Sequence, residues 1–185
     1  KADGFVSEST VGICHTRWAT HGRVTEENAH PLMAGEDRSV AIVLNGIVEN
    51  YRELRVRLGE SGHVFTSETD AETVTHLIEE NYEGDLVEAT RLAFNELEGH
   101  FAFVVIHRDH PSLLVGARCQ TPLVVGLGKQ ENFLASNAAA FLGETRNVVF
   151  PDDGDIVSIT PDSVEFVRAD GQPVDHEALE LDWDD

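Results

Sequence analysis

The chain has 185 residues, of which 41% are hydrophobic and 25% charged, as expected for one soluble globular domain with its own core. Thirty-four acidic against 13 basic residues give a net charge of −21, so nucleic acid and anionic membrane surfaces are not expected partners. The first ten residues, KADGFVSEST, lack the apolar core of a signal peptide, and no apolar run reaches the roughly 18–20 residues of a membrane span, so a cytoplasmic location is expected.

The acidity has a second implication, because only two of the bases are lysines, Lys1 and Lys129. A surface this rich in carboxylates suits a halophilic, high-salt cytoplasm in which their repulsion is screened. The two cysteines, Cys14 and Cys119, have neither metal-ligand spacing nor a disulfide framework, and we expect both to be buried thiols.

The first half of the chain combines short strands with helices. Strands are expected at residues 9–17, 39–47 and 63–66, and a loop at 28–38. The strand at 39–47 is an apolar, β-branched run that stops at Asn45-Gly46, and we expect it to be buried on both faces. Helical periodicity follows Asn50 and ends at Gly62. It resumes after Thr69, which stands at capping-box spacing from Glu72, and a third helix covers about 86–97.

The second half is dominated by strands, expected at residues 101–107, 113–118, 122–128, 132–136, 147–150, 155–159 and 164–167. Grouped strands and grouped helices indicate an α+β fold. We assign residues 1–170 to one domain and treat residues 171–185, which are acidic and weakly patterned, as a tail or linker.

The octapeptide HTRWATHG, residues 15–22, collects polar groups suited to a small zwitterion. Arg17 offers a planar fork for a carboxylate, Thr20 and His21 add polar contacts, and Trp18 could act as an apolar lid. The alternative is an ordinary exit from a strand with a surface arginine. No metal site is expected from the nearby Cys and His residues, because their spacing fits no common zinc pattern.

Two further positions permit functional readings. The side-chain amide of Asn45 and the backbone N–H of Gly46 could form the donor pair that a tetrahedral oxyanion requires, or the dipeptide could be a plain turn. Asp70 stands at the start of a predicted helix. It could bind a ligand ammonium group, or it could only stabilise the helix by capping free N–H groups and interacting with the helix dipole.

Taken in order, HTRWATHG, NAHP, LNGIVEN and SETDAE resemble the glutaminase domain of the glutamine–fructose-6-phosphate aminotransferases, a class II glutamine amidotransferase. The similarity continues through GARCQTPLVVGLG, ENFLASN and GDIVSIT. The resemblance implies an N-terminal-nucleophile (Ntn) hydrolase fold, an αββα sandwich. It also implies L-glutamine as the ligand, with its carboxylate on Arg17, contacts from Trp18, Thr20 and His21, its ammonium on Asp70, and an oxyanion hole at Asn45 and Gly46. No cofactor or metal is implied.

The family nucleophile is an N-terminal cysteine that precedes the octapeptide motif by several dozen residues, so we expect this chain to lack the first segment of the fold and to be inactive as it stands. Cys14 has no free α-amine to serve as base and cannot replace it. In the full-length protein, the resemblance implies C-terminal sugar isomerase domains, a homodimer, and transfer of ammonia to fructose 6-phosphate. Two alternatives remain: a phosphoribosylamine-forming amidotransferase, or a glutamine-sensing remnant without catalysis.

The charge generates a prediction about salt. At about 0.01 M salt the screening length is roughly 30 Å and at 1 M roughly 3 Å, so carboxylate repulsion should destabilise the fold only in dilute buffer. We expect the melting temperature, followed by circular dichroism, to rise between 0.01 M and 1 M KCl. A melting temperature that stays constant or falls would contradict the halophilic interpretation.

Overall fold

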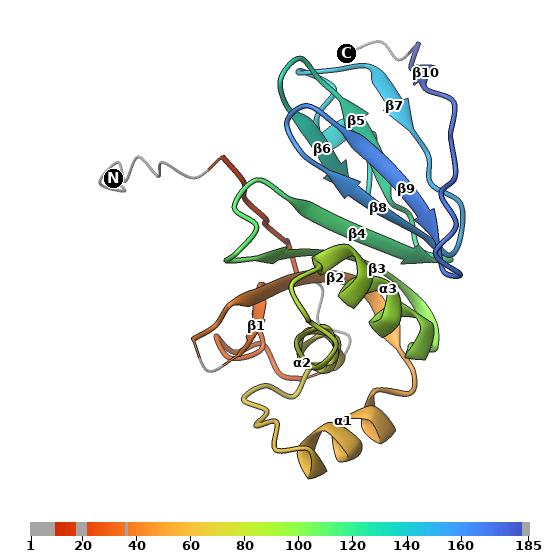
Figure 1. Cartoon of the computed structure of the whole chain (residues 1–185). Helices are drawn as coiled ribbons and strands as arrows, with labels where there is room; N and C mark the ends of the chain where they lie inside the picture. The colour runs from red at the N-terminus through yellow and green to blue at the C-terminus, as the bar shows by residue number, and fades with distance from the viewer. Residues whose placement is uncertain (1–9, 18–21, 36, 183–185) are drawn as a thin grey trace.

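The computed structural model describes residues 10–17, 22–35 and 37–182. Three helices cover one face of a six-stranded antiparallel sheet, and a four-stranded antiparallel sheet lies on the other side of it (Figure 1). The predicted α+β class is confirmed. None of the described helices is long and apolar enough to cross a membrane.

The helices of the described residues are α1 (Tyr51–Glu60), α2 (Asp70–Glu80) and α3 (Leu86–Glu96), together with the 3-10 turn η1 (Ala138–Ala140). The six-stranded sheet has the order β1 (Leu32–Ala34), β2 (Val40–Val48), β3 (Gly99–His107), β4 (Leu114–Cys119), β8 (Asp155–Ile159) and β9 (Val164–Arg168). The second sheet has the order β10 (Leu179–Glu180), β7 (Asn147–Val149), β5 (Val124–Leu127) and β6 (Asn132–Ala135).

Alternation along the strands divides the core into layers. In β2, Ile42 and Leu44 pack under the helices, whereas Val43 packs between the sheets, because successive side chains point to opposite faces. A third, smaller cluster lies on the outer face of the second sheet, where η1 and Phe141 cover Val124. The apolar run of β2 was correctly predicted to be buried on both faces.

The helix signals in the sequence are confirmed. The Thr69 side chain accepts a hydrogen bond from Glu72 N at 3.4 Å and caps α2, and Asp85 caps α3 in the same way. Helix α1 ends at Glu60, two residues before Gly62, as predicted.

Several local predictions are wrong. Residues 11–17 and 63–66 form no strand, and the predicted loop at 28–38 contains the edge strand β1. The strand at 9–17 was predicted because apolar Val11 and Ile13 alternate with small residues; this pattern matches the alternating exposure of 11–17 but carries no information on hydrogen bonding. In 63–66 the apolar Phe65 packs against the helix-side core instead of joining a sheet.

Two expectations about exposure also change. Cys14 is exposed and Cys119 is half-buried, so neither is the buried thiol expected from composition. The 171–182 segment packs onto the body of the domain. Strand β10 pairs with β7, Val174 N donates to Phe166 O at 3.0 Å, and His176 Nε2 lies 2.7 Å from an Asp155 carboxylate oxygen. A domain boundary at residue 170 stays a prediction.

Strand β2 continues through Gly46 instead of stopping there. Asn45 pairs with Ala102 and Gly46 with Phe101, and the ladder runs on to Val48. Gly46 has φ +103°, and a Cβ on it would lie 2.1 Å from His100 O, which no real side chain tolerates. The positive φ and the close approach of β3 at this position therefore require glycine.

This constraint predicts that Gly46→Ala lowers the free energy of unfolding by at least about 3 kcal/mol, since positive φ and backbone overlap both oppose the new methyl group. Urea unfolding measures the change. The matched control is Gly59→Ala in α1, where a Cβ meets nothing within 4 Å and should stabilise by up to about 1 kcal/mol. Equal effects of the two substitutions would contradict the role of Gly46.

Candidate functional site

A cavity of about 400 Å³ opens between the two sheets, and residues 43–45 of β2 form part of its wall. The N-terminal segment, β2, β3 and the second sheet all contribute to its wall. Its lining consists of Cys14, His15, Thr16, Val43, Leu44, Asn45, Ala102, Phe103, Val104, Pro122, Leu123, Leu134, Ala135, Ser136 and Ala140. Most of these side chains are apolar, so a polar ligand would find only a few directing groups, as is typical of small-molecule sites.

Asn45 is one of those directing groups. Its side chain is exposed on the cavity wall, on the same face of β2 as Val43, and among the described residues no hydrogen bond engages its amide. Because Asn45 and Gly46 lie inside a strand ladder, the turn interpretation of this dipeptide is wrong. The amide is instead available to a ligand in the cavity.

Asp70 ties the helical layer to the same strand. It is the first residue of α2, only 4% exposed, and its Oδ2 accepts a hydrogen bond from Val48 N at 2.8 Å. The helix cap is Thr69, so Asp70 is not needed as a cap. The Asp70 carboxylate is therefore fixed at the backbone of Val48, two residues beyond Gly46 in β2, although it does not line the cavity.

The Arg17 side chain contacts the backbone of Gly22 and Arg23. Its Nη1 donates to Arg23 O at 3.1 Å and its Nη2 to Gly22 O at 3.3 Å. The guanidinium thus has backbone carbonyls where a carboxylate was predicted, and it is not among the residues that line the cavity. Trp18, Thr20 and His21 lie outside the described residues.

Two residues that sequence reasoning missed attach this loop to the segment before α2. Asn28, 2% exposed, donates from Nδ2 to Arg23 O at 3.0 Å and accepts from Glu68 N at 2.8 Å. Glu68 accepts from Arg23 N at 3.1 Å, and this hydrogen bond and the one from Asn28 lower the pKa of its carboxyl. No local signal could reveal contacts between residues 40 or more positions apart.

Gly22 makes this junction possible. It has φ +77°, and a Cβ there would lie 2.9 Å from Asn28 Nδ2. The loop that follows the octapeptide is therefore held against Asn28 and Glu68. Glu68 in turn lies two residues before Asp70 in the sequence.

His15 and His30 form a close pair at the N-terminal wall, with 2.9 Å between their Nδ1 atoms. Burial, followed by the proximity of His15 and Arg17, lowers the pKa of His30 to about 4. Burial and Arg17 also lower the pKa of His15. Both shifts favour the neutral imidazoles.

Comparison with known proteins gives a consistent set of matches. The profile of the family described as "Glutamine amidotransferase domain" matches residues 15–143. A glutamine–fructose-6-phosphate aminotransferase (isomerizing) from Thermus thermophilus is 52% identical over 176 residues, and those from Aquifex aeolicus and Streptomyces coelicolor are each 48% identical. The alignments cover 95–96% of this chain but only 29–30% of those proteins.

Solved structures agree in fold. A glutamine phosphoribosylpyrophosphate amidotransferase from B. subtilis superposes with a TM-score of 0.70 at 23% identity, over 84% of this chain and 34% of that one. A glutamine aminotransferase class-II domain protein from silicibacter pomeroyi gives a TM-score of 0.51 at 16% identity, over 76% and 69% of the two chains. At these identities the likeness concerns the fold alone.

Proposed function

The chain belongs to the glutamine amidotransferase domain family, and from this premise we propose that it is the glutaminase part of an amidotransferase that hydrolyses L-glutamine to glutamate and ammonia. The observation that carries the proposal is the unengaged amide of Asn45 on the wall of the cavity between the sheets, next to a Gly46 that tolerates no side chain. The two packed sheets, the helices on the outer face of the larger sheet and the TM-score of 0.70 support an Ntn-type αββα sandwich, of which the described residues form one helical layer and both sheets, with only the η1 turn over the second sheet.

The proposed reaction uses a thiol and two donors. The nucleophile is the N-terminal cysteine that the family resemblance implies, with its own α-amine as base. Its sulfur attacks the glutamine amide carbon, and the oxyanion receives hydrogen bonds from Asn45 Nδ2 and Gly46 N. Ammonia leaves as the intermediate collapses to a thioester, and water then releases glutamate.

Ground-state binding is assigned to charged groups at the edge of the site. The glutamine carboxylate would replace the carbonyl oxygens of Gly22 and Arg23 on the Arg17 guanidinium, because a charged acceptor forms the stronger hydrogen bond. The carboxylate of Asp70 would hold the ammonium group, and Trp18, Thr20 and His21 would complete the pocket.

The acceptor of the ammonia is proposed to be fructose 6-phosphate, giving glucosamine 6-phosphate. Relatives that carry this name are 42–52% identical to the chain, whereas the phosphoribosylpyrophosphate amidotransferase structure is 23% identical. Because the chain spans about 29% of the length of these relatives, the transfer step, the sugar isomerase domains and a homodimer are assigned to the full-length protein.

The oxyanion role predicts that Asn45→Asp, in the full-length protein with its N-terminal cysteine, lowers glutaminase kcat by about 100-fold or more. The substitution keeps the size of the side chain but directs a negative charge at a developing negative charge. Glutamine KM should change much less, because the contact strengthens only in the transition state. Coupled detection of ammonia measures the rate.

The control for this experiment is Asn147→Asp, the same chemical change at an exposed position of β7 outside the cavity, which should leave kcat near that of the unmodified protein. Near-normal kcat in Asn45→Asp would remove the donor pair from the mechanism. Absence of glutaminase activity in the unmodified full-length protein would instead favour a glutamine-sensing remnant.

The carboxylate clamp predicts that Arg17→Lys raises glutamine KM by about 10-fold or more with a smaller effect on kcat, because lysine cannot form a bidentate contact. The matched control is Arg23→Lys in the same loop. Arg23 contacts Glu68 through its backbone N–H and Asn28 through its backbone carbonyl, so the substitution leaves these contacts in place. If both variants keep the unmodified KM, Arg17 does not bind the substrate.

A further inference from the structure

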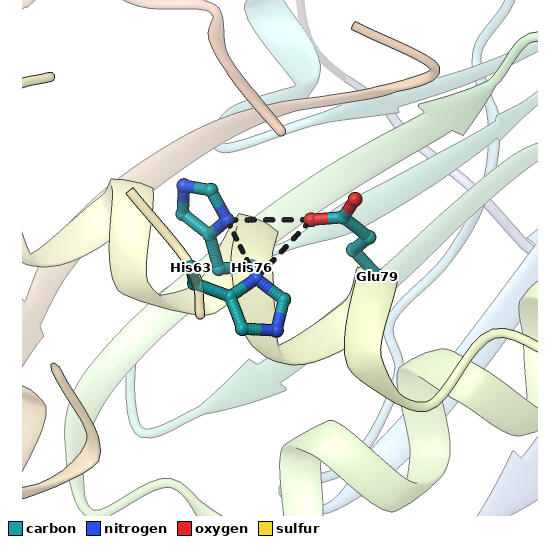
Figure 2. Close-up of side chains that lie close together, drawn as sticks. All are labelled: His63, His76 and Glu79. Carbon is teal, nitrogen blue, oxygen red and sulfur yellow. Dashed lines mark hydrogen bonds and ion pairs between the residues drawn. The ribbon is translucent and has the colours of Figure 1, made fainter. Parts of the chain in front are cut away.

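Three side chains outside the proposed glutaminase site converge on one point. His63 lies in the segment between α1 and α2, whereas His76 and Glu79 stand one turn apart on α2. The Nδ1 atoms of both imidazoles and Oε2 of Glu79 point toward one another (Figure 2). These three residues are called the His63 cluster below.

The spacing of the three atoms is that of ligands around one ion. The two Nδ1 atoms are 3.1 Å apart, and Glu79 Oε2 lies 3.4 Å from His63 Nδ1 and 3.3 Å from His76 Nδ1. Bonds of about 2.0–2.1 Å in a tetrahedron place neighbouring ligand atoms about 3.3–3.4 Å apart. We propose that the His63 cluster is a zinc site with two imidazole ligands and one carboxylate ligand.

Protons alone satisfy this arrangement poorly. A single Nδ1 proton serves only one of the three close contacts, and protons on both Nδ1 atoms would oppose each other across 3.1 Å. One cation bound to all three lone pairs removes the conflict.

The surroundings provide an outer partner and access. His76 is 6% exposed, and among the described residues its Nε2 has no hydrogen-bond partner; Oε1 of the buried Glu72 lies 4.0 Å away, within reach after a small side-chain shift. A carboxylate behind the second imidazole nitrogen is the usual support of a zinc-bound histidine. All three ligands also border a cavity of about 680 Å³, from which water can take the fourth position.

The ligand chemistry selects the ion. Two imidazoles with one carboxylate favour Zn²⁺ and its neighbours over Mg²⁺ and Ca²⁺, which prefer oxygen ligands. Bound zinc would fasten the 63–66 segment to α2. In the sequence this segment comes shortly before Glu68 and Asp70.

A second group of potential ligands, Asp152, Asp155 and His176, does not require an ion. His176 Nε2 lies 2.7 Å from Asp155 Oδ2, and Asp152 N donates to the same oxygen at 2.7 Å. Ordinary hydrogen bonds therefore account for that group, and it serves as the internal comparison.

The test is metal binding by the full-length protein after removal of metals with a chelator. Calorimetric titration with ZnCl₂ should give one site per chain, and MgCl₂ should give none. CoCl₂ should produce the strong visible absorption of a tetrahedral cobalt site. Glu79→Gln and His63→Gln should each weaken zinc binding by at least about 100-fold, since even outer partners contribute roughly 10–100-fold.

The control variant is His176→Gln, which should bind zinc like the unmodified protein. Circular dichroism checks that each variant is folded; if Glu79→Gln unfolds, His63→Gln decides, because His63 lies outside the helices. The proposal is overturned if the unmodified protein binds no zinc, or if zinc binding survives His63→Gln. Neither readout depends on glutaminase activity, so the zinc site and the proposed function can fail separately.

Discussion

The buried carboxylate of Glu72 organises the helical side of the molecule. Its side chain is 1% exposed and accepts hydrogen bonds from the backbone and hydroxyl groups of Thr66 and Ser67 at 2.7–2.8 Å, and from Arg55 Nη2 at 2.8 Å. Burial by itself raises the pKa of this carboxyl, but the hydrogen bonds from Thr66 and Ser67 outweigh it and keep the pKa below its ordinary value. Loss of Glu72 would leave Arg55 and two backbone N–H groups without their buried partner, and breaking a buried ion pair in this way typically costs several kcal/mol.

Because Glu72 fixes the segment before α2, it also fixes what that segment carries. Glu68 holds the loop after the octapeptide through Arg23 and Asn28, and Asp70 is bound to the backbone at the end of β2. Gly46, with its positive φ, lies in that same strand. The proposed oxyanion donors, ammonium partner and carboxylate clamp therefore belong to one connected framework, although only Asn45 among them lines the cavity.

The His63 cluster adjoins this framework through Glu72. Glu72 stands behind His76 at 4.0 Å while it binds Thr66 and Ser67. An ion bound by the cluster would therefore act on the segment that leads to Asp70 by restricting its motion. In a chain of net charge −21, a divalent cation at this position would also offset part of the local repulsion between carboxylates.

The sequence by itself determined the features that depend on local chemistry: the Thr69 cap and periodicity of α2, the buried strand β2, the α+β class, and the order of motifs that identifies the family. Tertiary structure decided the rest. Whether residues 11–17 join a sheet depends on hydrogen-bonding partners elsewhere in the chain, and the need for glycine at position 46 depends on how closely β3 approaches. Asn28, Glu68 and the His63 cluster gain their roles only from contacts between separate segments, because periodicity and spacing report which face a residue occupies and not which distant residue it meets.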